Sequence, residues 1–178
     1  MTDRKLIEAY CALCRSIQIV FEDAEHGMPA RRCLTCGLPV GEGTAALPGA
    51  NGKTVLCIDD SPLFRILLVE LLTKSGYVVR EAEDGPAGIA SARQEPPDVI
   101  LLDVVMPEMD GFATCAAIKA DPRLADIPIV ILTALNDPAL NERAFRSGAL
   151  LALHKMARPD TVLLTVAKAI SVQTTKRD

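Results

Sequence analysis

The chain has 178 residues, of which 49% are hydrophobic and 24% charged, so its composition is that of a globular protein and not of a disordered one. Its formal net charge of −4 and its 3% of aromatic residues argue against a surface built to bind nucleic acid by basic and stacking side chains. No apolar run approaches the roughly 18 residues that span a bilayer. The N-terminus also lacks the pattern of a signal peptide, so we expect a cytoplasmic protein.

Four of the six cysteines form two C-x-x-C pairs near the N-terminus: Cys11, Cys14, Cys33 and Cys36. In a reducing cytoplasm this spacing indicates a metal site, because two intervening residues let a tight turn aim both thiolates at one point. We therefore predict one structural Zn²⁺ held by these four residues, in a closed shell that leaves no position for catalysis. Iron in the same shell and a redox disulfide pair remain alternatives.

Residues 1–40 are too few to fold on a hydrophobic core alone, so metal binding would supply most of the folding free energy of this module. Apart from the cysteine turns we expect a single strand, at 17–21. Five basic and five acidic residues cancel over 1–40, which favours a protein partner over nucleic acid. Residues 41–52 hold four glycines and one proline, which predicts a flexible linker.

The remaining chain alternates strands and helices. Strands are predicted at 54–58, 77–82, 99–102, 127–132 and 149–154, and helices from Pro62 up to Gly76 and at 86–94, 111–120, 138–147 and 159–170. Five such units predict an α/β fold with a doubly wound, five-stranded parallel sheet over 53–172, followed by a polar tail at 173–178. In the first helix, five leucines form the predicted buried stripe: Leu63, Leu67, Leu68, Leu71 and Leu72.

Polar residues follow the carboxyl ends of four of these strands, which is where such sheets carry their functional sites. They are Asp59 and Asp60, then Asp103, Thr133 and Lys155. Three carboxylates in one cleft repel each other, and a hard divalent cation such as Mg²⁺ relieves that repulsion. With one hydroxyl and one ammonium group added, the set can hold a phosphoryl group beside a nucleophilic carboxylate.

Residues 53–170 resemble the receiver domain of two-component response regulators. The resemblance is carried by V-L-C-I-D-D-S, P-D-V-I-L-L-D-V-V-M-P-E-M-D-G, I-P-I-V-I-L-T-A and S-G-A-L-L-A-L-H-K. It implies a flavodoxin-like fold, with Asp103 as the phosphoacceptor and Asp59 and Asp60 as an acidic pair that binds Mg²⁺.

The same resemblance implies three further site residues. The backbone carbonyl of Val105 would be another Mg²⁺ ligand, Thr133 the switch hydroxyl, and Lys155 the ion-pair partner of Asp103 or its phosphate. The implied partners are a histidine kinase or phosphotransfer protein and a downstream protein, with no membrane insertion. We expect no enzymatic activity of the chain's own.

Two positions depart from the pattern of that family. Ala152 stands where the family usually has an aromatic residue, and Met156 where a proline usually follows the lysine. We expect the phosphoryl chemistry to survive and its structural readout to be weaker. Three hypotheses follow: a phosphorylated switch that signals through the receiver or the zinc module, a phosphorylation-independent pseudo-receiver scaffold, and a receiver-controlled zinc ribbon that binds nucleic acid.

Overall fold

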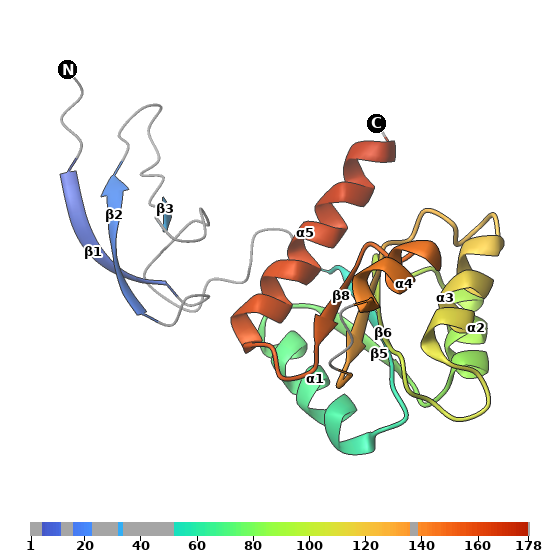
Figure 1. Cartoon of the computed structure of the whole chain (residues 1–178). Coiled ribbons are helices and arrows are strands. Elements are labelled where there is room, and N and C mark those ends of the chain that lie inside the picture. Colours follow the sequence, from blue (N-terminus) through green and yellow to red (C-terminus); the bar gives the residue numbers. More distant parts are fainter. Residues whose placement is uncertain (1–4, 12–15, 23–31, 34–51, 136–138, 178) are drawn as a thin grey trace. The chain divides into compact units, whose positions relative to one another are not determined.

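The computed structural model of the chain describes residues 5–11, 16–22, 32–33, 52–135 and 139–177. The chain divides into two compact units, residues 1–48 and residues 49–178, and each unit has its own β-sheet (Figure 1). Among the described residues, no helix combines the length and the apolar character that crossing a bilayer requires.

The first unit contains a three-stranded antiparallel sheet in the order β1-β2-β3. Its strands are β1 (Lys5–Cys11), β2 (Ser16–Glu22) and the short β3 (Arg32–Cys33). The prediction of a single strand was wrong, and the reason is that a lone strand leaves its backbone N–H and C=O groups unpaired. Two of the predicted metal ligands, Cys14 and Cys36, lie outside the described residues, as does the predicted linker up to residue 51.

The second unit contains a five-stranded parallel sheet in the order β5-β4-β6-β7-β8. The strands are β4 (Thr54–Ile58), β5 (Val78–Ala82), β6 (Val99–Asp103), β7 (Ile129–Thr133) and β8 (Leu151–His154). The helices are α1 (Pro62–Lys74), α2 (Gly85–Gln94), α3 (Gly111–Ala120), α4 (Leu140–Arg146) and α5 (Pro159–Arg177). The predicted doubly wound sheet is confirmed, and the fold is flavodoxin-like.

Helices cover both faces of this sheet. Helices α1 and α5 lie on one face, and α2, α3 and α4 on the other (Figure 1). The central strands β6 and β7 are buried along their whole length, as the continuous apolar run at 99–102 predicts. On the α3 side, aliphatic residues of β4, β6 and β7 pack in one core with Cys115 of α3 and Ala144 of α4.

Side-chain caps start three of the helices. Ser61, Asp84 and Asp110 each accept a hydrogen bond from the backbone amide three residues further on, at 3.4, 2.7 and 2.7 Å. A cap of this kind satisfies an amide that the helix itself leaves unpaired. Gly76, with φ +90°, supplies the left-handed residue just after α1. These caps fix the loops between the strand ends and the helices, which carry the predicted site residues.

Two details of the helices differ from the prediction. Leu63 and Leu67 of the predicted stripe are 69% and 53% exposed, while Leu68 and Leu72 are buried. The row of Leu63 and Leu67 lies about 140° around the helix from the row of Leu68 and Leu72, so a single sheet face cannot cover both rows. Helix α5 continues to Arg177, so most of the expected polar tail is helical, because neither glycine nor proline interrupts the chain after Ile170.

Gly111 opens α3 directly beneath the end of β6, and we predict that Gly111→Ala destabilises the second unit. An added Cβ would lie 2.0 Å from the carbonyl oxygen of Asp103, which is backbone and cannot turn aside. We expect a loss of about 1–3 kcal/mol, measured by urea unfolding followed by helical circular dichroism. The exposed Ala116→Ser on the same helix should cost no more than about 0.5 kcal/mol. Equal stability of Gly111→Ala and wild type would show that the backbone relaxes around the added methyl group.

Candidate functional site

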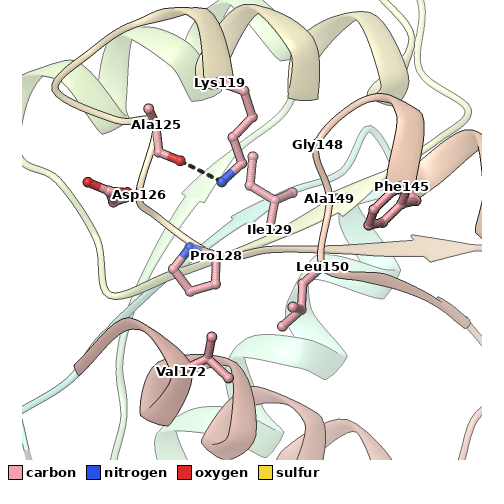
Figure 2. Close-up of a pocket in the computed structure, with 10 residues that line it drawn as sticks. All are labelled: Lys119, Ala125, Asp126, Pro128, Ile129, Phe145, Gly148, Ala149, Leu150 and Val172. Carbon is pink, nitrogen blue, oxygen red and sulfur yellow. Dashed lines mark hydrogen bonds between the residues drawn. The ribbon is translucent and has the colours of Figure 1, made fainter. Parts of the chain in front are cut away.

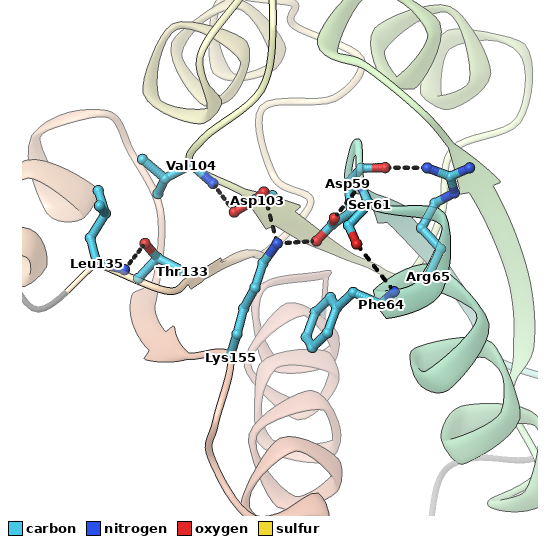
Figure 3. Close-up of polar contacts among 9 residues, drawn as sticks. All are labelled: Asp59, Ser61, Phe64, Arg65, Asp103, Val104, Thr133, Leu135 and Lys155. Carbon is cyan, nitrogen blue, oxygen red and sulfur yellow. Dashed lines mark hydrogen bonds and ion pairs between the residues drawn. The ribbon is translucent and has the colours of Figure 1, made fainter.

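Five polar residues lie at the carboxyl edge of the parallel sheet, and Figure 3 shows all of them except Asp60. Asp59 and Asp60 follow β4, Asp103 ends β6, Thr133 ends β7 and Lys155 follows β8. Because these four strands run in parallel and are neighbours in the sheet, their ends deliver the five side chains to one edge. The structure thus brings together the receiver residues that the sequence singles out.

An ion-pair bridge links three of them. The Lys155 Nζ lies 2.7 Å from Asp59 Oδ2 and 2.8 Å from Asp103 Oδ2 (Figure 3). Both carboxylates are almost fully buried, and the lysine side chain is 15% exposed. The ammonium group also lies 4.7 Å from the centroid of the Phe64 ring, within the range of a cation–π contact. Lys155 therefore supplies the positive charge that lets two buried carboxylates stand side by side.

Backbone groups orient the same carboxylates. Asp103 Oδ1 accepts a hydrogen bond of 2.7 Å from the Val104 amide, and Asp59 Oδ1 accepts one of 2.9 Å from the Ser61 amide. The Arg65 guanidinium donates to the backbone carbonyl of Asp59 at 2.5 Å. Each buried aspartate is thus held through one oxygen by the backbone, while its other oxygen faces Lys155.

The three aspartates are suited to a divalent cation. Asp59, Asp60 and Asp103 each offer one carboxylate oxygen, and these oxygens all lie within 4.8 Å of one another. Asp60 is exposed, so a bound ion would keep part of its water shell. A ligand set of carboxylate oxygens with water is the one that Mg²⁺ prefers. Val105, two residues beyond Asp103, lies at the surface. That its backbone carbonyl binds the ion stays a prediction.

Burial and charge act in opposite directions on this site. Burial raises the pKa of Asp103 above its ordinary value, and the hydrogen bond and charge of Lys155 oppose that rise without cancelling it. Burial by itself would lower the pKa of Lys155, but the hydrogen bonds to Asp103 and Asp59 outweigh it and the pKa is raised. The lysine is therefore firmly charged, whereas the ionised form of Asp103 depends on the positive charges around it.

Thr133 is fully buried at the end of β7. Its Oγ1 accepts a hydrogen bond of 3.0 Å from the Leu135 amide, which leaves the hydroxyl proton unused by that bond (Figure 3). A hydroxyl in this state can donate to an anion that arrives at the neighbouring Asp103. Its role as a switch stays a prediction.

Sequence reasoning did not identify two residues of α1 that shape the site, Phe64 and Arg65. Phe64 lies beside the Lys155 ammonium, and Arg65 bonds the Asp59 carbonyl. The signal for both was the cap at Ser61, because a helix that starts there places its first turn directly after the acidic pair. Their contacts also depend on how the helix is rotated, which the pattern of residues does not define.

A separate hollow lies at the amino end of β7. It is a cavity of about 170 Å³, lined by apolar residues of β7, α4, α5 and the loops before β7 and β8, together with Lys119 and Asp126 (Figure 2). The Lys119 Nζ donates to the carbonyls of Ala125 and Ile127, at 2.8 and 2.6 Å, so it ties down the loop before β7. Among the residues described as lining this cavity there is no cluster of several acids with a base and a hydroxyl, such as the one at the carboxyl edge of the sheet.

An acidic triad, a buried lysine and a hydroxyl thus lie together at the carboxyl ends of a five-stranded parallel sheet, as the resemblance to a receiver domain implies. Residues 55–167 match the family model described as "Response regulator receiver domain", and the chain belongs to this family. Protein PilH of Pseudomonas aeruginosa is 38% identical over 112 residues, which cover 63% of this chain and 93% of PilH.

A longer protein and a protein of solved structure are also similar to this chain. The "DNA-binding dual master transcriptional regulator RpaA" of Synechocystis is 43% identical over 95 residues, but the chain spans only 39% of RpaA. Chemotaxis protein CheY4 of Vibrio cholerae has a structure that matches with a TM-score of 0.64 and 33% identity, covering 66% of this chain and 98% of CheY4. Residues 1–54 lie outside the family match.

We predict that Asp103→Asn raises the Tm of the second unit in metal-free buffer at pH 7. The variant removes a buried charge whose burial is not fully compensated, and Lys155 keeps Asp59 as its partner. The expected gain is about 3 °C or more, measured by calorimetry. The exposed Asp126→Asn is the matched control and should leave the Tm unchanged.

The difference in Tm between Asp103→Asn and wild type should also depend on pH, with a defined sign. The folded pKa of Asp103 is raised, so the wild type gains stability as the pH falls through that value, and the asparagine variant does not. The difference in Tm should therefore shrink as the pH is lowered toward 4. A difference that is constant, or that grows at low pH, would contradict the assignment of the buried charge to Asp103.

Proposed function

We propose that this chain is a phosphoacceptor response regulator of a two-component phosphorelay, phosphorylated on Asp103. As a receiver, it has a histidine kinase as its general partner, and a phosphotransfer protein is a further possible donor. The observation that carries the proposal is the environment of Asp103. It is buried, ion-paired with Lys155, and grouped with Asp59 and Asp60 in a cluster of oxygen ligands.

In the proposed reaction a carboxylate oxygen of Asp103 attacks the phosphorus of a phosphohistidine. The new O–P bond forms as the N–P bond breaks, and the imidazole leaves. A Mg²⁺ ion held by Asp59, Asp60, Asp103 and the Val105 carbonyl would neutralise charge on the transferred group. Lys155 can follow the new phosphate from its present place beside Asp103, and the Thr133 hydroxyl can donate to it.

The decisive measurement is the intact mass of the protein after incubation with acetyl phosphate and Mg²⁺. We expect wild type to gain one phosphoryl group, and Asp103→Asn to gain none. Asp60→Ala should slow the reaction by about tenfold or more, because it removes a ligand from the cation that screens the incoming anion. Asp126→Asn, which changes an exposed acid outside the site, should behave like wild type.

Two results would overturn this proposal. The first is an equal gain of mass by wild type and Asp103→Asn, which would place the modification elsewhere. The second is no reaction of either protein with acetyl phosphate or with a panel of histidine kinases. The second result would favour the phosphorylation-independent scaffold, because the fold would then be retained without its chemistry.

We infer that the output is a contact with another protein and that the chain acts in the cytoplasm, without enzymatic activity of its own. Leu63, Ile66 and Leu67 of α1 form an exposed apolar group beside the site, and such groups favour protein contacts. Ala152 of β8 packs against the core with a single methyl group, so it offers little bulk for the usual aromatic readout. The net charge of −4 disfavours the nucleic-acid alternative.

We also propose that Cys11, Cys14, Cys33 and Cys36 bind one Zn²⁺ in the first unit. The main support is the spacing of the two pairs. Cys11 is the last residue of β1 and Cys33 the last of β3, so each begins its C-x-x-C pair where a strand stops. Strand ends that pass into short turns suit thiolate ligands.

The backbone register sets a condition on this zinc site. Cys11 lies opposite Ser16 of β2 and Cys33 opposite Val20, so the two cysteines are separated by roughly 13 Å along the strand direction. Because β3 runs antiparallel to β2, the chain at Cys33 heads toward the end of β2 where Cys11 lies. Cys33 must also reach the ion itself, and because Zn–S bonds are about 2.3 Å long, a separation of this size is too large for one site. Zinc binding by all four cysteines therefore requires the pairing of β3 with β2 to change.

Elemental analysis of protein purified without chelator should find one zinc per chain. Cys33→Ser should lose the metal and leave the calorimetric transition of the second unit in place, since that unit has a core of its own. Cys115→Ala, in α3, should keep the metal. Absence of metal, or iron with its visible absorption, would contradict the zinc assignment.

A further inference from the structure

We propose that His154 is a positioning residue for Lys155, through a hydrogen bond that holds the loop after β8. The proposal rests on the proposed function, because it concerns how the lysine is presented to Asp103. His154 is the last residue of β8 and precedes Lys155 directly.

Three successive amides of this loop are bound. The Lys155 amide donates to the Thr133 carbonyl at 2.7 Å, the Met156 amide to His154 Nδ1 at 3.1 Å, and the Ala157 amide to the His154 carbonyl at 2.8 Å. Two of the three acceptors thus belong to His154. Lys155 lies between His154 and the two residues whose amides His154 binds, so His154 defines the backbone from which the lysine side chain reaches the carboxylates.

The bond from Met156 to His154 is a side-chain turn. An acceptor that binds the amide two residues ahead reproduces the geometry that aspartate and asparagine use in turns. Nδ1 can accept only when it carries no proton, so the neutral ring carries its proton on Nε2. That Nε2 is buried and has no hydrogen-bond partner in the described part of the chain. The ring is therefore oriented by its Nδ1 contact and not by a partner for Nε2.

Little else in the loop restrains the lysine. Met156 is 84% exposed, so its side chain provides no packing anchor, and it lacks the ring by which a proline would fix its own φ. His154 also lies opposite Thr133 in the register of β7 and β8. One residue thus connects the end of β7, the start of the loop and the lysine.

The test compares His154→Asn with His154→Gln. Asparagine places its carbonyl oxygen close to the position of Nδ1 and keeps the turn, whereas glutamine extends its polar group toward the position of Nε2. With acetyl phosphate and Mg²⁺, we expect His154→Asn to react within about twofold of wild type. His154→Gln should react about tenfold more slowly, because small displacements of a positioned group have large kinetic effects. The two variants should have similar melting temperatures.

Hydrogen exchange of the Met156 amide, measured by NMR, separates this proposal from the proposed function. Exchange should be slow in wild type and His154→Asn and faster in His154→Gln. If wild type is not phosphorylated at all, the proposed function fails, and the exchange rates still decide whether His154 holds the loop. Equal rates of phosphorylation and equal hydrogen exchange of the Met156 amide in all three proteins would overturn the proposal. So would an asparagine variant as impaired as the glutamine variant, because the aromatic ring and not its acceptor would then be needed.

Discussion

The arrangement of the second unit depends on one ammonium group placed between two buried carboxylates. Asp59 comes from the end of β4, Asp103 from β6 and Lys155 from the edge strand β8. In the order β5-β4-β6-β7-β8 the carboxyl ends of these three strands lie along one edge of the sheet, and the long side chain of Lys155 reaches past β7 to the two acids. The core thus positions the charges, and the buried charges are tolerated because they are paired.

This ion-pair bridge is not arranged to maximise the stability of the fold. Burial makes ionised Asp103 costly, and Lys155 compensates for only part of that cost. The stability comes from the apolar strands beneath, above all β6 and β7, which are buried throughout. Under the proposed function, Lys155 and the aspartates would exchange their ion pairs for contacts with a cation and a phosphoryl group, which apolar side chains in their place could not do.

The order of strands and helices and the edge that carries the site could be predicted, because they depend on short-range patterns such as the apolar run of β6 and the acids after it. The rotation of α1 could not, since both of its leucine rows are equally apolar in sequence and only packing decides that Leu63 stays exposed. The contacts of Phe64 and Arg65 could not be predicted for the same reason, although the cap at Ser61 places both residues near the acidic pair. His154 gave no signal, because its bond to the Met156 amide depends on the turn that follows β8. In the first unit the spacing of the cysteines is visible, but the paired hairpin of β1 and β2 was not expected.

The departures at Ala152 and Met156 affect how a movement of Thr133 or Lys155 is transmitted to the rest of the second unit. Along β8, Ala152 lies opposite Ile131 and His154 opposite Thr133, so the residue next to the hydroxyl is the histidine and not the small alanine. A methyl group at 152 can move little when Thr133 moves. The loop after β8 is linked to Thr133 more directly, since the Lys155 amide binds the Thr133 carbonyl and the Met156 amide binds His154. A displacement of Thr133 or Lys155 toward Asp103 would therefore act first on this loop, which carries the exposed Met156.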